Sequence, residues 1–332
     1  MKKLVATLFM IGLIAIGALG QAPTLKIVTE TPGLPSELFY GNVKVKPVRL
    51  RPGTNTPITI ADYDFFIQQQ YIDLLKRFPE AGPDGIYGTA DDPLKFYVDI
   101  LNGCNPSDIE CIKYTRGALS ANFFRSPEFQ RKGNYVMYLY MVSIGQRPVT
   151  PAELPLKNDP TLNDRPHYTE FFADLSSIST PNDDPALTNA KKDALAVDWI
   201  SRPQIQSLYP SSLTNAQFAQ KLSDTAGVTL SSSTQSAVAS ASTRAQILRI
   251  IAESPEVDAK FYNPAFVTME YLGYLRRDPE DCHNSANWSD GTPSSCGFIF
   301  HNQRFQNVAN KDFLENTIVR GFIESPEYIN RF

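Results

Sequence analysis

A helical pattern that occurs twice, 200 residues apart, constrains the fold of this chain more than any other feature of its sequence. The first copy runs from Tyr63 to Pro79, and its apolar residues recur at the spacing of one broad helical face. Each copy ends at a proline, because the residue before proline avoids the α region. The matched pairs are Phe66/Phe266, Ile67/Val267, Tyr71/Tyr271, Ile72/Leu272, Leu75/Leu275, Arg77/Arg277 and Pro79/Pro279.

Residues that favour helix starts precede these patterns. Asp62 is suited to cap the first copy, and Asn263-Pro264 supplies an N-cap followed by a proline at the first helical position of the later copy. A third copy starts at Tyr135, and a fainter fourth lies around Phe218. The chain therefore contains about four helical units.

A Ser-Pro-Glu signature closes the units. It occurs at Ser126, Ser254 and Ser325, and in a degraded form as Ser201-Arg202-Pro203-Gln204. Serine caps helices well, and proline and glutamate suit the first helical turn. The signature predicts that one helix stops and another begins at each of these points.

These signatures predict an all-α fold of about four tandem helical units behind a short extended or β N-terminal arm. Within the arm, residues 43–50 alternate apolar and basic side chains, the period of an exposed or edge strand. Units of this size bury little surface alone, so we expect neighbours to pack on one another. The expected division is a signal peptide at 1–20, a Pro-rich arm at 21–62, and units at 63–133, 134–210, 211–260 (degenerate) and 261–332.

The N-terminus has the features of a secretory signal peptide. Lys2 and Lys3 precede an apolar run, and Ala18-Leu19-Gly20 fits a cleavage site. Removing the two lysines from 31 basic residues leaves 29 against 35 acidic residues, a net charge of −6. This balance argues against a nucleic-acid partner. We predict an exported periplasmic, cell-surface or extracellular protein that does not span the membrane once it is processed.

The four cysteines are expected to form two local disulfides, because export leads to an oxidising compartment. Ser107 to Glu110 has the pattern of a capping box, which places Cys111 in a first helical turn and Cys104 in the loop before it. On one continuous helix the two would lie about 10 Å apart, too far for a bridge. We expect the pairs Cys104–Cys111 and Cys282–Cys296 rather than either crossed arrangement.

An acidic loop after the first helix is a candidate calcium site. Glu80, Asp84, Asp91 and Asp92 supply carboxylates, and glycines between them permit a tight loop around a hard cation. The loop is not an EF-hand, because position twelve counted from Asp84 is Lys95. The alternative is a polar turn in which the Asp side chains bond to their own backbone.

Other chemical signatures are weak. A zinc site from Cys282-His283, Cys296 and His301 is disfavoured because adjacent ligands chelate poorly, and His167 stands alone. The sequence has no Gly-x-Ser-x-Gly, His-Glu-x-x-His or phosphate-loop signature, which favours a non-catalytic protein. Tyr135, Tyr138 and Tyr140 cannot all face one core, so an exposed aromatic surface for a protein or glycan is expected.

Two short motifs resemble those of the domain of unknown function 4214 family. Leu75-Lys76-Arg77-Phe78-Pro79 and residues 275–279 are similar to its Leu-Gly-Arg-x-Pro motif, without the glycine. The stretch from Thr243 to Val257 is similar to its closing motif. The resemblance covers residues 63–332 in pieces. It implies an all-helical, non-catalytic module of exported bacterial proteins, more distantly similar to the scaffolding linker domains of phycobilisomes, and it transfers no catalytic residue.

The sequence thus predicts a non-catalytic, exported structural or interaction protein of the bacterial cell envelope or surface, of scaffold or adhesion type. Its expected partner is a cell-surface or extracellular protein or glycan. One alternative is a cell-envelope hydrolase or glycan-binding protein whose site is built from the insertions at 80–95, 155–190 and 280–297. Another is a calcium-stabilised surface module.

Overall fold

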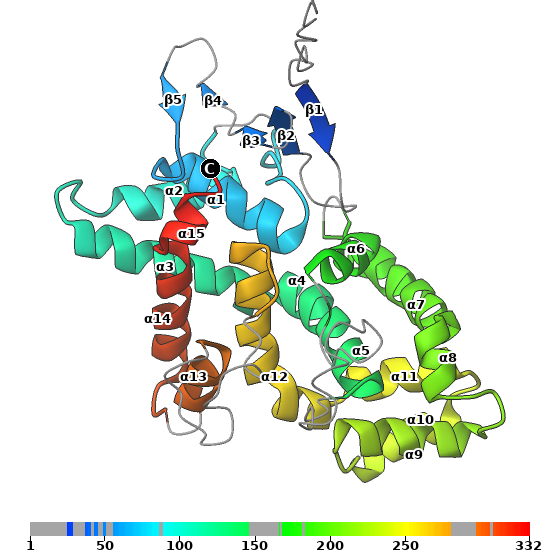
Figure 1. Cartoon of the computed structure of the whole chain (residues 1–332). Helices are drawn as coiled ribbons and strands as arrows, with labels where there is room; N and C mark the ends of the chain where they lie inside the picture. Colours follow the sequence, from blue (N-terminus) through cyan, green and yellow to red (C-terminus); the bar gives the residue numbers. More distant parts are fainter. Residues whose placement is uncertain are drawn as a thin grey trace, which may run out of the picture.

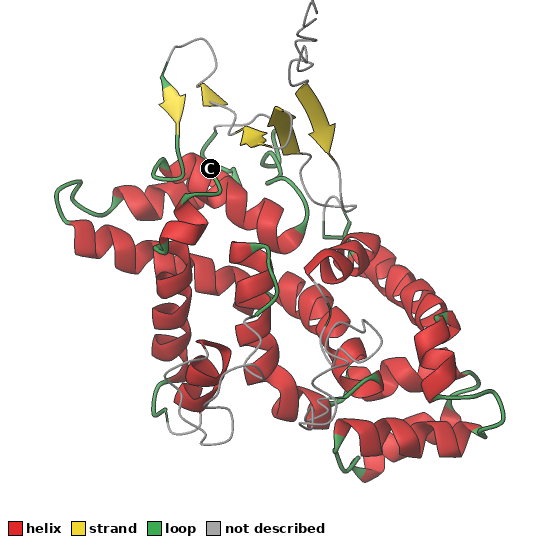
Figure 2. Cartoon of the chain, viewed as in Figure 1, coloured by secondary structure: helices red, strands yellow, loops and turns green. Residues whose placement is uncertain are grey.

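The chain is an all-α protein with short strands near its N-terminus (Figures 1 and 2). The computed structural model describes residues 25–28, 37–40, 43–45, 49–50, 56–85, 89–145, 166, 168–180, 183–279, 297–305 and 308–332. The predicted signal peptide, His167, His283, Cys282 and Cys296 lie outside these ranges. In the segments described, no helix is long and apolar enough to cross a membrane.

The strands form two small antiparallel sheets. One has the order β1-β2-β3, and the other is a pair of β4 and β5. The predicted alternating segment 43–50 forms two strands, of which β3 is at an edge of its sheet, as the pattern indicated. The bounds are β1 Leu25–Val28, β2 Glu37–Tyr40, β3 Val43–Val45, β4 Arg49–Leu50 and β5 Pro57–Ile58.

The helices follow the repeated signatures. The first half of the chain contains α1 Tyr63–Gln70, the π-helical turn η1 Tyr71–Leu75, α2 Pro93–Asn102, α3 Ile109–Arg125, α4 Pro127–Phe129, a second π-helical turn η2 Gln130–Asn134, α5 Tyr135–Ser143 and α6 Tyr168–Ile178. The second half contains α7 Pro185–Ser201, α8 Pro203–Leu208, α9 Asn215–Ala226, α10 Ser232–Ser240, α11 Arg244–Ala252, α12 Pro255–Glu270, η5 Tyr271–Leu275, α13 Gly297–Arg304, α14 Lys311–Ile323 and α15 Pro326–Ile329.

The repeat extends to the backbone conformation of the two matched helices. Both end in a five-residue π-helical turn, η1 and η5, and in both the next residue is left-handed. These residues are Lys76, with φ 57°, and Arg276, with φ 51°. Left-handed backbone is costly for side chains other than glycine, so its presence at both positions identifies one local structure used twice.

The Ser-Pro-Glu signature starts helices as predicted. The hydroxyl oxygens of Ser126, Ser254 and Ser325 each accept a hydrogen bond from the backbone amide three residues later. Proline follows each serine at the first helical position, where its missing N–H costs nothing. The degraded signature also starts a helix, α8, but Arg202 stands at its cap without a side-chain capping bond.

The predicted helix start at Asn263-Pro264 was wrong. Helix α12 starts at Pro255 and continues through Pro264. Likewise α4, η2 and α5 follow one another without a break, so the boundaries predicted after residues 133 and 260 fall inside helical stretches. The helix is capped upstream by Ser254. The residues around Asn263 alone do not show that they lie inside a helix that began earlier.

The units pack in two pairs: the first unit with the last, and the two inner units with each other. Helix α3 of the first unit packs against α14 of the last, and η1 contacts η5. The two inner units pair in the same manner, with α5 against α9 and α7 against α11. Figure 1 shows the first pair on the left of the molecule and the second on the right. The expectation that chain neighbours form the main contacts therefore holds for the inner pair and fails for the outer one.

The predicted exposed aromatic surface at Tyr135, Tyr138 and Tyr140 was also wrong. All three lie on α5, whose residues are all buried, with α6, α9, α11 and α12 packed around it. A helix that is apolar on every side belongs in a core rather than at a surface. The tyrosine hydroxyls bond to the Lys192 carbonyl, Asp258 and Asp174, respectively.

Candidate functional site

A groove of about 740 Å³ lies where the loop after η1 meets α6 and α7. Figure 1 shows the end of the first repeated helix beside α6. Two of the predicted insertions, 80–95 and 155–190, contribute to its walls, although much of the second forms α6 instead of a loop. The lining residues are Lys76, Arg77, Phe78, Pro79, Glu80, Ala81, Ser176, Ser179, Thr180 and Lys191.

Arg77 fixes the shape of this groove. Its guanidinium forms two hydrogen bonds with the Glu128 carboxylate, at 2.8 and 2.7 Å, and lies 2.6 Å from Glu80. The later copy repeats the arrangement between Arg277 and Glu327. The repeated arginine thus ties the loop after its helix to the glutamate of its own Ser-Pro-Glu signature, and two carboxylates balance the charge of Arg77.

Lys76 and Lys191 are two basic side chains of the groove that lack a carboxylate partner among the described residues. The Lys76 ammonium has no hydrogen-bond partner and lies 3.4 Å from the centre of the Phe172 ring. The Lys191 ammonium donates to the Ser179 carbonyl at 2.6 Å. Across the described part of the chain, no carboxylate lies within ion-pair distance of either lysine. Burial lowers the pKa of Lys76 well below its ordinary value, and Asp73 opposes this shift.

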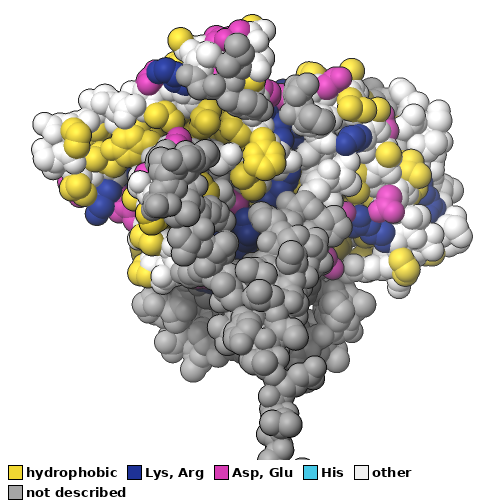
Figure 3. All heavy atoms as spheres, turned by 90° about the horizontal axis from the view of Figure 1, so that it is seen from above, with side chains coloured by type: hydrophobic (Ala, Val, Ile, Leu, Met, Phe, Trp, Pro, Cys, Tyr) yellow, Lys and Arg dark blue, Asp and Glu magenta, His cyan; other side chains and the backbone are white. Residues whose placement is uncertain are grey.

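The groove also has an apolar, exposed rim. The Phe78 side chain is 66% exposed, whereas Pro79 beside it is buried. Figure 3 shows hydrophobic side chains next to Lys and Arg side chains in the middle of the face seen from above. An aromatic ring beside hydroxyl and ammonium groups suits a ligand that has an apolar face and polar edges.

A second, smaller pocket of about 280 Å³ lies among η2, α5, α7, α11 and α12. Its charged groups already have partners within the protein: Lys192 contacts Glu253, and Asp258 accepts from the Tyr138 hydroxyl at 2.8 Å. The polar groups that line this pocket therefore hold the helices together, and the groove at Phe78 is the stronger candidate.

In the acidic loop, carboxylates bond to the loop itself. Asp92 accepts from the Gly82 amide at 2.7 Å, and Asp91 accepts from the Asp84 amide at 3.2 Å. Glu80 instead pairs with Arg77. No group of three or more His, Cys, Asp or Glu side chains among the described residues could hold a metal ion. This geometry is that of the polar turn, and the calcium site stays a prediction that melting with calcium and with a chelator tests.

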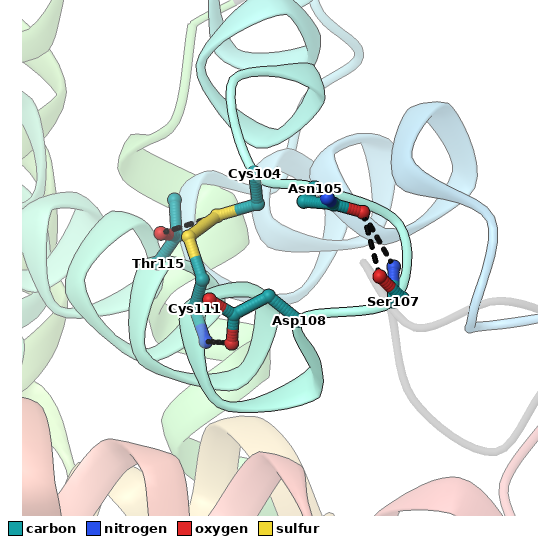
Figure 4. Close-up of a disulfide and its surroundings, with 6 residues drawn as sticks. All are labelled: Cys104, Asn105, Ser107, Asp108, Cys111 and Thr115. Carbon is teal, nitrogen blue, oxygen red and sulfur yellow. Dashed lines mark hydrogen bonds between the residues drawn. A yellow bond between two sulfur atoms is a disulfide. The ribbon is translucent and has the colours of Figure 1, made fainter.

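The Cys104–Cys111 disulfide is confirmed, with the two Cα atoms 5.8 Å apart (Figure 4). Asp108 caps α3, accepting from the Cys111 amide at 3.0 Å, one residue later than the predicted capping box. Ser107 instead donates to the Asn105 side chain and closes the turn between the cysteines. The predicted Cys282–Cys296 pair lies outside the described residues.

Sequence reasoning missed the groove lysines, and a comparison of the copies would have indicated Lys76. Arg276, its counterpart, pairs with Asp73, whereas the counterpart of Asp73 is Gly273. The two copies thus differ at both members of an ion pair. Lys191 and Phe78 carry no such signal, because only the folded chain brings α7 to the loop.

No family model matches the chain, and no curated protein or solved structure shows significant similarity to it. The fold therefore defines an all-α protein of paired helical units. The resemblance to the domain of unknown function 4214 family remains a prediction that rests on its motifs.

Proposed function

We propose that this chain is a non-catalytic interaction protein of the bacterial cell envelope or surface, and that its partner binds in the groove beside Phe78. The observation that carries the proposal is the combination of an exposed ring with two lysines that lack carboxylate partners, in a groove of about 740 Å³. Such a combination offers a ligand both an apolar contact and basic side chains that have no carboxylate partner among the residues that the structure describes.

The charged groups next to the groove support a binding role because they pair with one another and hold the walls of the groove together. Glu128 bonds to Arg77 and also to Lys132, whose ammonium lies 3.3 Å from Asp183. This chain of alternating charges joins the first unit to the segment that leads into α7. It stiffens the groove, and a preorganised groove loses less entropy when it binds.

The disulfide supports export. Cys104 and Cys111 are bonded to each other, and disulfides persist in oxidising compartments such as the periplasm and the cell surface. Export by the N-terminal segment therefore remains part of the proposal, as does a cell-surface or extracellular protein or glycan as the partner.

The test is capture of partners from an envelope extract by the mature chain, compared with two matched variants. Phe78→Ala removes the exposed ring at the groove, and Phe96→Ala removes a ring that is 60% exposed on α2. We expect Phe78→Ala to lose the captured partner and Phe96→Ala to keep it. Equal loss in both variants, or turnover of an envelope glycan by the unaltered chain, contradicts the proposal.

A further inference from the structure

The two copies of the repeat place a basic side chain at one position, but only one of them finds a carboxylate. Arg276 Nη2 lies 2.9 Å from Oδ1 of Asp73, across the contact between the outer units. Lys76 has the same left-handed backbone as Arg276. Its expected acidic partner is missing because Gly273 stands where the earlier copy has Asp73.

The structure leaves this lysine in an unfavourable state. Its ammonium is buried without a hydrogen bond, and the Phe172 ring offers only a cation–π contact. Burial therefore disfavours the charged form of Lys76, and an anion bound beside its amino group would favour the ammonium form. Lys76 is itself one of the residues that line the groove.

A second ammonium reinforces the first. Lys191 comes from α7 and uses one of its three N–H donors on the Ser179 carbonyl. Glu80, the acidic residue of the lining, is engaged by Arg77. The groove therefore offers an anionic ligand the Lys191 ammonium and the Lys76 amino group, which such a ligand would help to protonate, and its lining has no unpaired acid to repel that ligand.

We infer that the groove binds an acidic glycan, a polymer of sugars that carry carboxylates. The carboxylate pairs with Lys76 and Lys191, and the apolar face of the sugar ring lies on Phe78. The Ser179 hydroxyl donates to the Leu175 carbonyl at 2.8 Å, and its oxygen can still accept from a sugar hydroxyl. This inference rests on the proposed function and names its ligand.

An acidic peptide fits the groove less well. Peptides bind along a free strand edge, as an amphipathic or polyproline helix in an apolar groove, or, when acidic, on a cluster of arginines. Arg77, the arginine of this lining, is already engaged by Glu80 and Glu128. Here α6 and α7 form one wall, so their backbone groups are already bonded within the helices. Phe78, Pro79 and Ala81 supply too short an apolar surface for a helix. Sugar rings require only an aromatic face and scattered polar groups.

The test measures binding of the full mature chain to three probes: polygalacturonate, neutral dextran and poly-glutamate. We expect polygalacturonate to bind at least tenfold more tightly than the other two and to weaken as salt is added. Lys191→Gln is expected to weaken it about tenfold, since one charge-assisted bond is lost. Lys113→Gln, at a lysine whose side chain is 42% exposed on α3, is the matched control and is expected to bind normally.

Several results overturn the inference. If dextran binds as tightly as polygalacturonate, charge plays no role in binding. If poly-glutamate binds as tightly, the ligand need not be a glycan. If Lys191→Gln binds polygalacturonate normally, the binding site is not this groove. Lys76→Met is also expected to weaken polygalacturonate binding, and its binding is compared only if its circular dichroism matches that of the unaltered chain. If the variant does not fold, the test rests on Lys191→Gln. Phe78-dependent capture of an envelope partner without polygalacturonate binding leaves the proposed function standing and rejects the acidic glycan, whereas loss of both rejects both.

Discussion

Oδ1 of Asp73 accepts a hydrogen bond from Nη2 of Arg276 at 2.9 Å, although 203 residues separate the two in the chain. Arg331 donates to the same oxygen at 3.0 Å. Burial raises the pKa of the fully buried Asp73 carboxyl, but Arg331 and Arg276 outweigh burial and hold it below its ordinary value. The first and last units are thus joined by charge as well as by apolar packing.

Asp73→Asn is expected to destabilise the fold by about 3–5 kcal/mol, because it leaves two arginines without their carboxylate. Urea unfolding at pH 7 measures this loss. Since the folded pKa is depressed, the contribution of Asp73 is present above its unfolded pKa of about 3.9 and disappears as the pH falls through the folded value. A variant within 1 kcal/mol of the unaltered chain at pH 7 contradicts the role of this cluster.

The sequence predicts the local structure well where capping and apolar periodicity agree. Ser126 and Ser325 start helices as expected, and the helix at Tyr63 begins where the pattern places it, whereas the segment at Tyr135 continues a helical stretch that starts at Pro127. It does not predict the pairing of units, because an amphipathic face shows that a helix packs but not on which partner. Asp73 illustrates the limit: its acidic side chain on a helix gives no sign of a partner 203 residues away.

The two repeated arginine–glutamate pairs should differ in strength. Glu128 and Arg77 are nearly buried, with side chains 8% and 9% exposed, whereas Glu327 is 45% exposed. Glu128→Gln is expected to cost about 3 kcal/mol because it removes the carboxylate that contacts both Arg77 and the buried ammonium of Lys132. Glu327→Gln at the matched position is expected to cost less than about 1 kcal/mol. Unfolding in urea measures both, and equal losses would show that burial does not set the strength of the pair.

Glu270 makes the stability of the fold fall as the pH rises. It is fully buried without a hydrogen-bond partner, and burial, together with Glu315, raises its pKa well above the ordinary value. The folded chain therefore retains a proton that the unfolded chain releases above about pH 4.3, and stability falls by about 1.4 kcal/mol per pH unit until the folded pKa is reached.

Glu270→Gln is expected to remove this part of the pH dependence. Gln70 occupies the matched position in the first copy and bonds to Ser120 and Tyr328, so the repeat itself accepts an amide there. The variant should match the unaltered chain near pH 5 and exceed it near pH 8 in urea unfolding. Parallel curves for the two proteins across this range would reject a raised pKa at Glu270.

Gly117 permits the close approach of α3 to α14. A Cβ atom there would lie 3.1 Å from Cβ of Arg320 and 3.2 Å from the Asn316 carbonyl oxygen. A Cβ atom added to Gly321, on α14, would have no described atom within 4 Å beyond its own stretch of helix. Gly321→Ala is expected to stabilise the fold by about 0.5–1 kcal/mol through helix propensity. Gly117→Ala should fall at least about 1 kcal/mol below it in thermal unfolding, since crowding opposes the same gain. Equal gains would show that the helices can separate at no cost.

The Cys104–Cys111 disulfide stabilises the turn between α2 and α3, and its effect is separable from helix capping. Replacing both cysteines by serine is expected to cost about 2 kcal/mol, the value for a short closed loop. Asp108→Ala, which removes the cap of α3, is expected to cost about 1 kcal/mol with or without reductant. Adding reductant to the unaltered chain should reproduce the loss seen in the double serine variant if the Cys104–Cys111 bond dominates. A larger loss on reduction than in that variant would reveal a second stabilising disulfide, as expected for Cys282–Cys296, and peptide mapping under oxidising conditions would identify it.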